Sequence, residues 1–270
     1  MFDTKIALWS GGKDSTVMVD KLLRDGVRPD FIVFTDTLIE FEDMITYINK
    51  VKKYWANRYG VEVTILTPNK EFKDVIFNVR GSTGRKTSPA NIGKIAGMLS
   101  PTASFCEWRR ESKIRPLERF LKAKGIKKYT RLVGFTTDEV HRVKGKIDDN
   151  ITEEYPLINI YKMSELDCKT YLLEMEMENP LYRNFNRTGC RLCPYQSKED
   201  WRAIYSHYPA VWQELKDLEQ EVKSHEREAV SYSSFAGFKT CEDMEEYFNS
   251  TPAFSFDEDN VPLKDCFCKI

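Results

Sequence analysis

The sequence lacks any apolar run near the roughly 18–20 residues that a membrane-spanning helix needs. Its N-terminus, MFDTKIALWSGGKDS, lacks the basic stretch and long apolar core of a secretory signal, so we expect a cytoplasmic protein. It also lacks an excess of charge of either sign, because 41 Lys and Arg face 42 Asp and Glu. This balance argues against a globally basic nucleic-acid-binding protein, although it allows a local basic surface.

Internal repeats and low-complexity tracts are also absent, and what is present is typical of a globular enzyme. The 270 residues are 41% hydrophobic and 31% charged, which is enough for a packed core. This length suits one full α/β domain with a smaller addition.

Strand-like and helix-like segments alternate over the first 160 residues, which predicts a doubly wound parallel sheet covered by helices on both faces. The expected strands are residues 5–9, 31–34, 61–66 and 131–134. The expected helices are residues 15–25, 42–58 and 112–124. Residues 68–106, rich in Gly, Ser, Thr and basic side chains, resemble a mobile loop over a site.

The pattern becomes mainly helical after residue 163, with helices expected at 164–176, 198–207 and 210–227. We therefore expect a nucleotide-binding α/β domain over residues 1–162. A helical, cysteine-bearing region should follow over residues 163–270.

The strongest local motif is Ser-Gly-Gly-Lys-Asp-Ser-Thr at residues 10–16, between a predicted strand and a predicted helix. Its two glycines let the backbone turn tightly and approach an anion closely. The N–H groups and dipole of the helix N-terminus then face that anion. Neither a Walker A loop nor a Rossmann G-x-G-x-x-G is present. A plain helix-capping turn is the alternative.

This motif resembles the PP-loop of the adenine nucleotide α-hydrolase-like (HUP-type) superfamily, in which the loop binds the phosphates of ATP or of an adenylated substrate. The resemblance implies that seven residues bind nucleotide: Ser10, Gly11, Gly12, Lys13, Asp14, Ser15 and Thr16. Asp14 is also expected to take part in catalysis, near a Mg²⁺ ion that bridges the phosphates.

Further segments resemble the phosphoadenylyl-sulfate (PAPS) reductase family. The segment at residues 35–42, TDTLIEFE, resembles D-T-G-x-x-F-P-E-T, with Leu38 in place of the glycine. Its Asp36 follows a strand and suits a ribose hydroxyl or a metal. Arg109 and Lys113, which follow Cys106, resemble C-x-x-R-x-x-x-K-x-x-P-L and form a candidate phosphate or sulfate clamp.

The segment that starts at Gly134 resembles the family pattern G-x-R-x-x-E-S-x-x-R. Asp138 and Arg142 are taken as the acid and the arginine, and Thr136 stands where the family has its first arginine. A strand end followed by a basic side chain suits an anionic ligand. Gly134, Asp138 and Arg142 are therefore further candidate nucleotide-binding residues.

The second strong motif is Asn-Pro-Leu-Tyr at residues 179–182, followed by C-x-x-C-P at Cys190 and Cys193. It resembles the N-P-L-Y…R-x-G-C-x-x-C-P pattern of iron–sulfur or metal-bearing relatives. Two thiolates at this spacing can bind one metal centre. A [4Fe-4S] cluster held by Cys106, Cys190 and Cys193 is favoured. Zinc, a redox dithiol and buried structural thiols stay open.

The C-terminal Asp-Cys-Phe-Cys-Lys-Ile carries two further thiols, Cys266 and Cys268. Cys268 is the candidate fourth metal ligand, and three cysteines with one open iron is the alternative. Reductase relatives carry a nucleophilic cysteine in a terminal E-C-G-L/I-H segment, and this tail lacks its glycine and histidine. Cys106, Cys266 and Cys268 are the candidate catalytic thiols.

Two reactions fit this set of residues. In one, ATP adenylates an oxygen of a nucleic acid, and a sulfur nucleophile then displaces AMP. In the other, a cysteine attacks the sulfur of PAPS or APS. The departure of the tail from the reductase form favours the first, an ATP-dependent sulfurtransferase. Its expected partners are a tRNA or DNA acceptor and a sulfur-donor protein or thioredoxin-like reductant. A non-catalytic nucleotide-binding module is the third possibility.

Overall fold

The computed structural model describes residues 4–81, 88–101, 106–144, 147–235, 237 and 239–251. Its contacts divide the chain into two compact units, each assembled from separate stretches of sequence. Among the described residues, unit 1 comprises those in the ranges 4–68 and 112–188, and unit 2 those in the ranges 69–111 and 189–251. This division differs from the expected boundary at residue 162, because residues 163–188 belong with the sheet and residues 69–111 belong with the C-terminal stretch.

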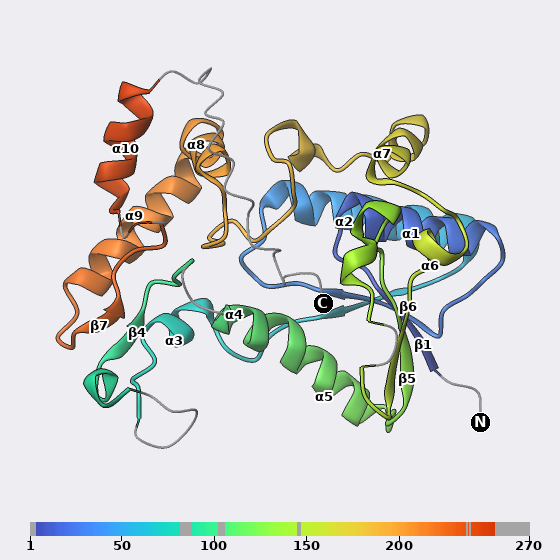
Figure 1. Cartoon of the computed structure of the whole chain (residues 1–270), viewed down its shortest axis with the longest axis horizontal. Coiled ribbons are helices and arrows are strands. Elements are labelled where there is room, and N and C mark those ends of the chain that lie inside the picture. Colours follow the sequence, from blue (N-terminus) through green and yellow to red (C-terminus); the bar gives the residue numbers. More distant parts are fainter. Residues whose placement is uncertain are drawn as a thin grey trace. The chain divides into compact units, whose positions relative to one another are not determined.

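Unit 1 is built on a five-stranded parallel sheet in the order β3-β2-β1-β5-β6. Figure 1 labels three of these strands, β1, β5 and β6. The strands are β1 (Thr4–Leu8), β2 (Phe31–Thr35), β3 (Val63–Leu66), β5 (Tyr129–Leu132) and β6 (Ile151–Glu154). The order reverses at β1, which lies between β2 and β5. In parallel α/β sheets, ligands gather beyond the carboxyl ends of the strands at such a reversal.

Helices cover both faces of this sheet, as the alternating pattern predicts. Alternate β1 residues, Ile6 and Leu8, share a core with Leu117 and Leu121 of α5 (Arg115–Ala123). On the opposite face, the ring of Trp9 lies 4.7 Å from that of Trp55 in α2 (Glu42–Tyr59). The doubly wound α/β fold is therefore confirmed.

Three more helices of unit 1 are α1 (Lys13–Arg24), α6 (Pro156–Asn159) and α7 (Glu165–Glu174). Asp20 of α1 is fully buried and ties this layer together. It accepts hydrogen bonds from Trp55 Nε1 of α2 at 3.0 Å, from Tyr171 of α7, and from Arg24 Nε at 2.8 Å. These bonds fix α1, and with it the turn that precedes it.

Unit 2 is mainly helical. Its elements are α3 (Phe72–Ile76), β4 (Ile95–Gly97), α4 (Glu107–Arg109), α8 (Lys198–His207), α9 (Pro209–Lys223), β7 (Ala229–Ser231) and α10 (Cys241–Ser250). β4 and β7 pair in parallel, so the two stretches of this unit share a small sheet. Residues 69–101, expected as loop, therefore carry a helix and a strand.

A π-helical turn, Arg110–Ile114, precedes α5 where one continuous helix was expected. The short helices Pro89–Asn91, Thr137–Arg142 (η3) and Pro180–Arg183 (η4) are 3₁₀. Among the described residues, no helix is both long enough and apolar enough to cross a membrane.

Candidate functional site

The phosphate-loop candidate, residues 10–16, joins the end of β1 to the start of α1. Gly11 adopts φ 75°, where L side chains are strained, and a Cβ there would lie 2.7 Å from Met44 Sδ. Thr16 ties the turn together: its hydroxyl donates to the Gly12 carbonyl at 2.9 Å and accepts from Trp9 Nε1 at 2.9 Å. The sequence therefore builds a tight turn that directs the N-terminus of a 12-residue helix beyond the sheet.

Gly134, just beyond β5, packs directly on this turn. A Cβ at Gly134 would lie 2.7 Å from Ser15 Cα and 2.8 Å from Ser15 N. Both atoms are backbone, so no side-chain rotation could relieve the clash. Gly134 is therefore required for the close approach of the β5 end to the first turn of α1.

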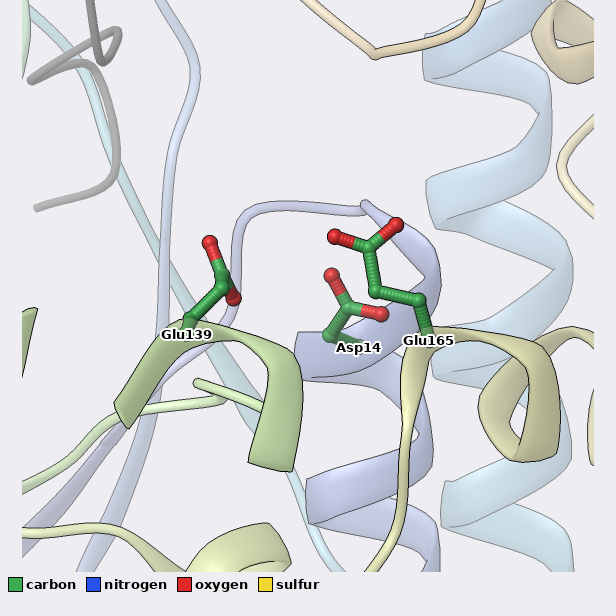
Figure 2. Close-up of side chains that lie close together, drawn as sticks. All are labelled: Asp14, Glu139 and Glu165. Atoms are coloured by element: carbon green, nitrogen blue, oxygen red, sulfur yellow. The ribbon is translucent and has the colours of Figure 1, made fainter. Parts of the chain in front are cut away.

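Three carboxylates gather beside the loop (Figure 2). Carboxylate oxygens of Asp14, Glu139 and Glu165 all lie within 4.8 Å of one another. Asp14 and Glu139 are buried, and Glu165 is exposed. Carboxylate oxygens are ligands that Mg²⁺ takes, so the donor type fits this ion. These three residues could hold a divalent cation.

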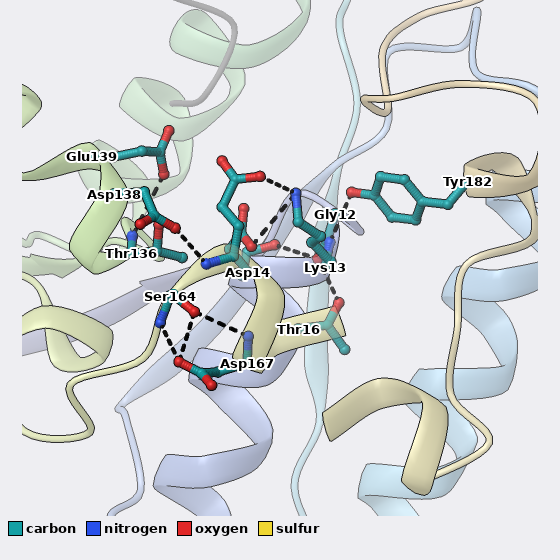
Figure 3. Close-up of polar contacts among 12 residues, drawn as sticks. Gly12, Lys13, Asp14, Thr16, Thr136, Asp138, Glu139, Ser164, Asp167 and Tyr182 are labelled. Carbon is teal, nitrogen blue, oxygen red and sulfur yellow. Dashed lines mark hydrogen bonds and ion pairs between the residues drawn. The ribbon is translucent and has the colours of Figure 1, made fainter. Parts of the chain in front are cut away.

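Two cations lie against these carboxylates, and Figure 3 shows the first of them, Lys13, beside Asp14. Lys13 Nζ is 2.8 Å from Glu165 Oε2 and 3.8 Å from Asp14 Oδ1, and Arg142 pairs with Glu139. Burial lowers the pKa of Lys13, but the negative charge of Asp14 and the hydrogen bond to Glu165 outweigh it, so the pKa is raised. Lys13 is therefore charged at neutral pH.

A segment far along the chain also reaches the loop. Asn179 Nδ2 donates to the Gly11 carbonyl at 3.0 Å, and the backbone N–H of Lys13 donates to the Tyr182 hydroxyl at 2.9 Å. Burial of the phenol raises the pKa of Tyr182, so the group stays a neutral hydroxyl. The loop backbone is therefore held by side chains of residues 179–182.

Other predicted residues of unit 1 have local roles. Asp36 Oδ1 accepts the N–H of Leu38 at 2.8 Å, in a turn where Leu38 has φ 59°. Asp138 Oδ2 accepts the N–H of Glu165 at 2.7 Å and so caps the start of α7. Arg142 pairs with Glu139, which holds it at the acidic group. Lys113 is half-buried in the π-helical turn.

The cysteines predicted as metal ligands belong, where described, to unit 2. Cys190 and Cys193 lie on one turn, in which the N–H of Cys193 donates to the Cys190 carbonyl at 3.1 Å. Cys193 is buried, and Cys190 and Cys106 are half-buried. In the described part of the chain, no trio containing a cysteine comes within 4.8 Å. Cys266 and Cys268 lie outside the described residues.

Two more cysteines, Cys168 and Cys241, are buried. Cys168 lies in α7 and Cys241 begins α10. Burial raises the pKa of both thiols, which keeps them protonated at neutral pH. They therefore lack the thiolate character of a nucleophile or metal ligand.

The charge balance allows a local basic surface, and two of the arginines that could contribute to one are paired with carboxylates. Arg191 makes two hydrogen bonds to Glu214, at 2.7 and 2.8 Å, and Arg80 contacts Glu107 at 3.1 Å. Arg109 is half-buried. Arg110 and Arg183 are exposed. Arg85 and Lys86 lie outside the described residues.

Four residues at the loop were not predicted there: Glu139, Glu165, Asn179 and Tyr182. Counting along the family pattern from Gly134 places the acid at position 139, so spacing alone could have identified Glu139. The Asn-Pro-Leu-Tyr motif was noticed, but it was grouped with the cysteines. No local pattern distinguishes Glu165 from an ordinary acidic residue in the first turn of a helix.

The family model for the phosphoadenosine phosphosulfate reductase domain matches residues 4–196. The uncharacterized protein MJ0066 of Methanocaldococcus jannaschii is 27% identical over 216 residues, which are 79% of this chain and 41% of that protein. MJ0973 of the same organism is 26% identical over 219 residues, 78% of this chain and 46% of that protein. The chain thus spans less than half the length of these relatives.

Two solved structures are also similar. Phosphoadenylyl-sulfate reductase from Candida auris, in complex with phosphate, aligns with a TM-score of 0.47 and 15% identity, over 70% of this chain and 82% of that one. The U34-tRNA thiolase NcsA from Methanococcus maripaludis, with its [4Fe-4S] cluster, aligns with a TM-score of 0.38 and 17% identity. This alignment covers 84% of this chain and 75% of that one. Scores of this size carry no inference about what this chain binds.

Proposed function

Because this chain belongs to the phosphoadenosine phosphosulfate reductase domain family, we propose that it is a PP-loop enzyme that binds ATP or an adenylyl sulfate and transfers or reduces sulfur. The favoured reaction is ATP-dependent sulfur transfer to a nucleic acid, either tRNA or DNA. The alternative is thiol-dependent reduction of PAPS or APS. A nucleotide-binding module without catalytic activity is the third hypothesis.

The observation that carries this proposal is the arrangement at the start of α1. The turn at residues 10–16 suits phosphate groups, and the carboxylates of Asp14, Glu139 and Glu165 lie beside it. A phosphate site next to oxygen ligands suits a triphosphate that arrives with a divalent cation. Attack of a thiolate on a sulfonucleotide needs no such cation. The carboxylates therefore favour ATP over PAPS.

The residues of the loop would act by binding and orienting the nucleotide. The N-terminus of α1 and the ammonium of Lys13 would stabilise negative charge on the phosphates. Lys13 would have to leave Glu165 to reach a phosphate, so nucleotide and Glu165 compete for it. Mg²⁺, when bound, would neutralise phosphate charge. Asp14, Glu139 and Glu165 would be its ligands.

In the favoured reaction, a carbonyl oxygen of the acceptor base attacks the α-phosphorus of ATP, and pyrophosphate leaves. A sulfide sulfur then adds to the activated carbon, and the C–O bond breaks to release AMP. If a persulfide adds instead, a second thiol cleaves the S–S bond of the adduct and leaves a disulfide. The alternative reaction breaks the S–O bond of PAPS or APS, as a thiolate takes the sulfonate and the nucleotide leaves. A second thiol then releases sulfite and leaves a disulfide.

Cys106, Cys190 and Cys193 are the proposed ligands of a [4Fe-4S] cluster in unit 2. Thiolates are the ligands that such clusters take, and a turn bearing two of them suits one cluster. Cys268 is the proposed fourth ligand, and an open iron is the alternative. The cluster, when bound, would hold the sulfur to be transferred. Zinc at the same cysteines would make this site structural.

Binding measurements separate the two nucleotide classes. We expect Mg·ATP to bind more tightly than PAPS or APS by isothermal titration calorimetry. Glu139→Gln should weaken Mg·ATP binding, because it removes one negative oxygen ligand, and Glu246→Gln is the matched exposed control. Preferential binding of PAPS with no effect of Mg²⁺ would support the reductase instead. A full protein that binds neither nucleotide would contradict the proposal.

Anaerobic purification tests the metal centre. We expect a broad absorption band near ~400 nm and about four irons per chain. Cys190→Ala and Cys193→Ala should abolish both, whereas Cys241→Ala should retain them. Stoichiometric zinc without colour would contradict the cluster and leave the nucleotide site untouched.

A further inference from the structure

We infer that Asn179 and Tyr182 are positioning residues of the phosphate loop, which hold its backbone ready for phosphate groups. This assigns the Asn-Pro-Leu-Tyr motif to the nucleotide site, whereas its sequence position groups it with the cysteines. The inference rests on the proposed function in one respect, namely that phosphates bind at residues 10–16.

Asn179 fixes the peptide between Gly11 and Gly12. Its side chain is 1% exposed; Nδ2 donates to the Gly11 carbonyl at 3.0 Å, and Oδ1 accepts the N–H of Leu181 at 3.0 Å. The C=O and N–H of a trans peptide point in opposite directions, so holding the Gly11 carbonyl also directs the Gly12 N–H. Glycine gives this peptide unusual freedom, which makes an external hold necessary.

Tyr182 holds the next peptide of the loop. The N–H of Lys13 donates to its hydroxyl at 2.9 Å, and the Lys13 ammonium lies 5.6 Å from its ring centroid (Figure 3). A Cβ on Gly12 would meet the Tyr182 hydroxyl and the Thr188 hydroxyl, each at 3.3 Å. Asn179 and Tyr182 thus hydrogen-bond to the loop backbone on either side of Gly12.

The segment that carries these two residues is itself anchored to α2. The Tyr47 hydroxyl donates to the Met177 carbonyl at 3.0 Å, ahead of Asn179. Beyond Tyr182, the rings of Phe41 and Phe185 lie 5.2 Å apart. Because one end contacts α2 and the other contacts Phe41, the residue just before α2, Asn179 and Tyr182 are held on both sides as they face the loop.

The expected consequence is a selective loss of phosphate affinity. A loop held in its binding conformation does not lose that freedom again when the ligand binds. Releasing the Gly11–Gly12 peptide should therefore weaken binding of groups that use its N–H. A ligand without phosphates should be unaffected, because it makes no use of that peptide.

The test compares Asn179→Ala with Asn186→Ala, an exposed asparagine on the same segment. Affinities for Mg·ATP, pyrophosphate and adenosine would be measured by calorimetry on the full chain. We expect Asn179→Ala to lose about tenfold in affinity for ATP and pyrophosphate, equal to about 1.4 kcal/mol, and less than about twofold for adenosine. Tyr182→Phe, which removes only the phenol oxygen, should show the same selective loss of affinity. If Asn179→Ala does not fold, Tyr182→Phe alone tests the inference.

Equal losses for adenosine and pyrophosphate would show a general structural role and overturn the inference. Unchanged affinity for ATP in folded Asn179→Ala and Tyr182→Phe would overturn it as well. Failure of the wild-type chain to bind ATP, PAPS or pyrophosphate is a different result, which refutes the proposed function itself.

Discussion

Replacing Gly134 by alanine is the sharpest test of how the sheet positions the phosphate loop. The new Cβ would lie 2.7 Å from Ser15 Cα, whereas ordinary contact begins at 3.4 Å, so one backbone must shift by 0.7 Å. Gly134 has no positive φ, so the substitution brings steric overlap without conformational strain. The displaced element is the first turn of α1 or the end of β5.

Two magnitudes follow from this displacement. Overpacking of this kind costs about 1–3 kcal/mol, so the free energy of unfolding should fall by that amount in urea titrations. A shift approaching 1 Å in a binding loop also misplaces its donors, and we expect at least a ~10-fold loss in affinity for pyrophosphate.

The matched control is Gly189→Ala, where a Cβ would meet its nearest neighbour, Cys193 Cβ, at an ordinary 3.9 Å. The free energy of unfolding of this variant should lie within about 0.5 kcal/mol of the wild-type value. A Gly134→Ala protein with wild-type stability and pyrophosphate affinity would refute the packing described for the loop.

Three other outcomes are expected. Asp20→Ala should lower the free energy of unfolding by about 3 kcal/mol, since it leaves Arg24 and the Trp55 indole without their shared partner; a loss below 1 kcal/mol in urea titration would contradict this. The hydrogen bond from Lys216 lowers the pKa of Glu245, aided by Trp212 and opposed by burial, so its contribution to stability is present at neutral pH and lost as pH falls below about 4. Glu245→Gln should therefore destabilise the protein at pH 7 and much less at pH 3, and equal destabilisation at both would refute the linkage. Glu165→Gln should weaken Mn²⁺ binding, measured by electron paramagnetic resonance without nucleotide, and unchanged binding would remove Glu165 from the cation site.

Much of the sheet could be predicted because its buried strands are short apolar runs. Residues 5–9, 31–34, 61–66 and 131–134 each overlap an observed strand. β6 was missed because Ile-Thr-Glu-Glu is an edge strand of half-buried residues, which has no continuous apolar run. α10 was missed because most of its residues are polar, and its buried face consists of Cys241, Met244 and Phe248.

The site was harder to predict than the fold, because its parts meet only in three dimensions. Residues 10–16 carry a local pattern that can be recognised in the sequence alone. Asn179 and Tyr182 are about 170 positions away and contact the loop through single polar atoms. The acid beside the loop is Glu139, at the position that the family spacing from Gly134 indicates, while the neighbouring Asp138 caps a helix.

The interleaving of the two units determines how this chain can be divided. Residues 69–111 leave unit 1 after β3 and return to it before α5, so they form an insertion within the sheet unit. Their strand β4 pairs with β7, which comes from the C-terminal stretch. A truncation after residue 188 would keep all five strands of the main sheet and remove the hydrogen-bonding partner of β4. An isolated sheet unit would instead require a short linker between residues 68 and 112.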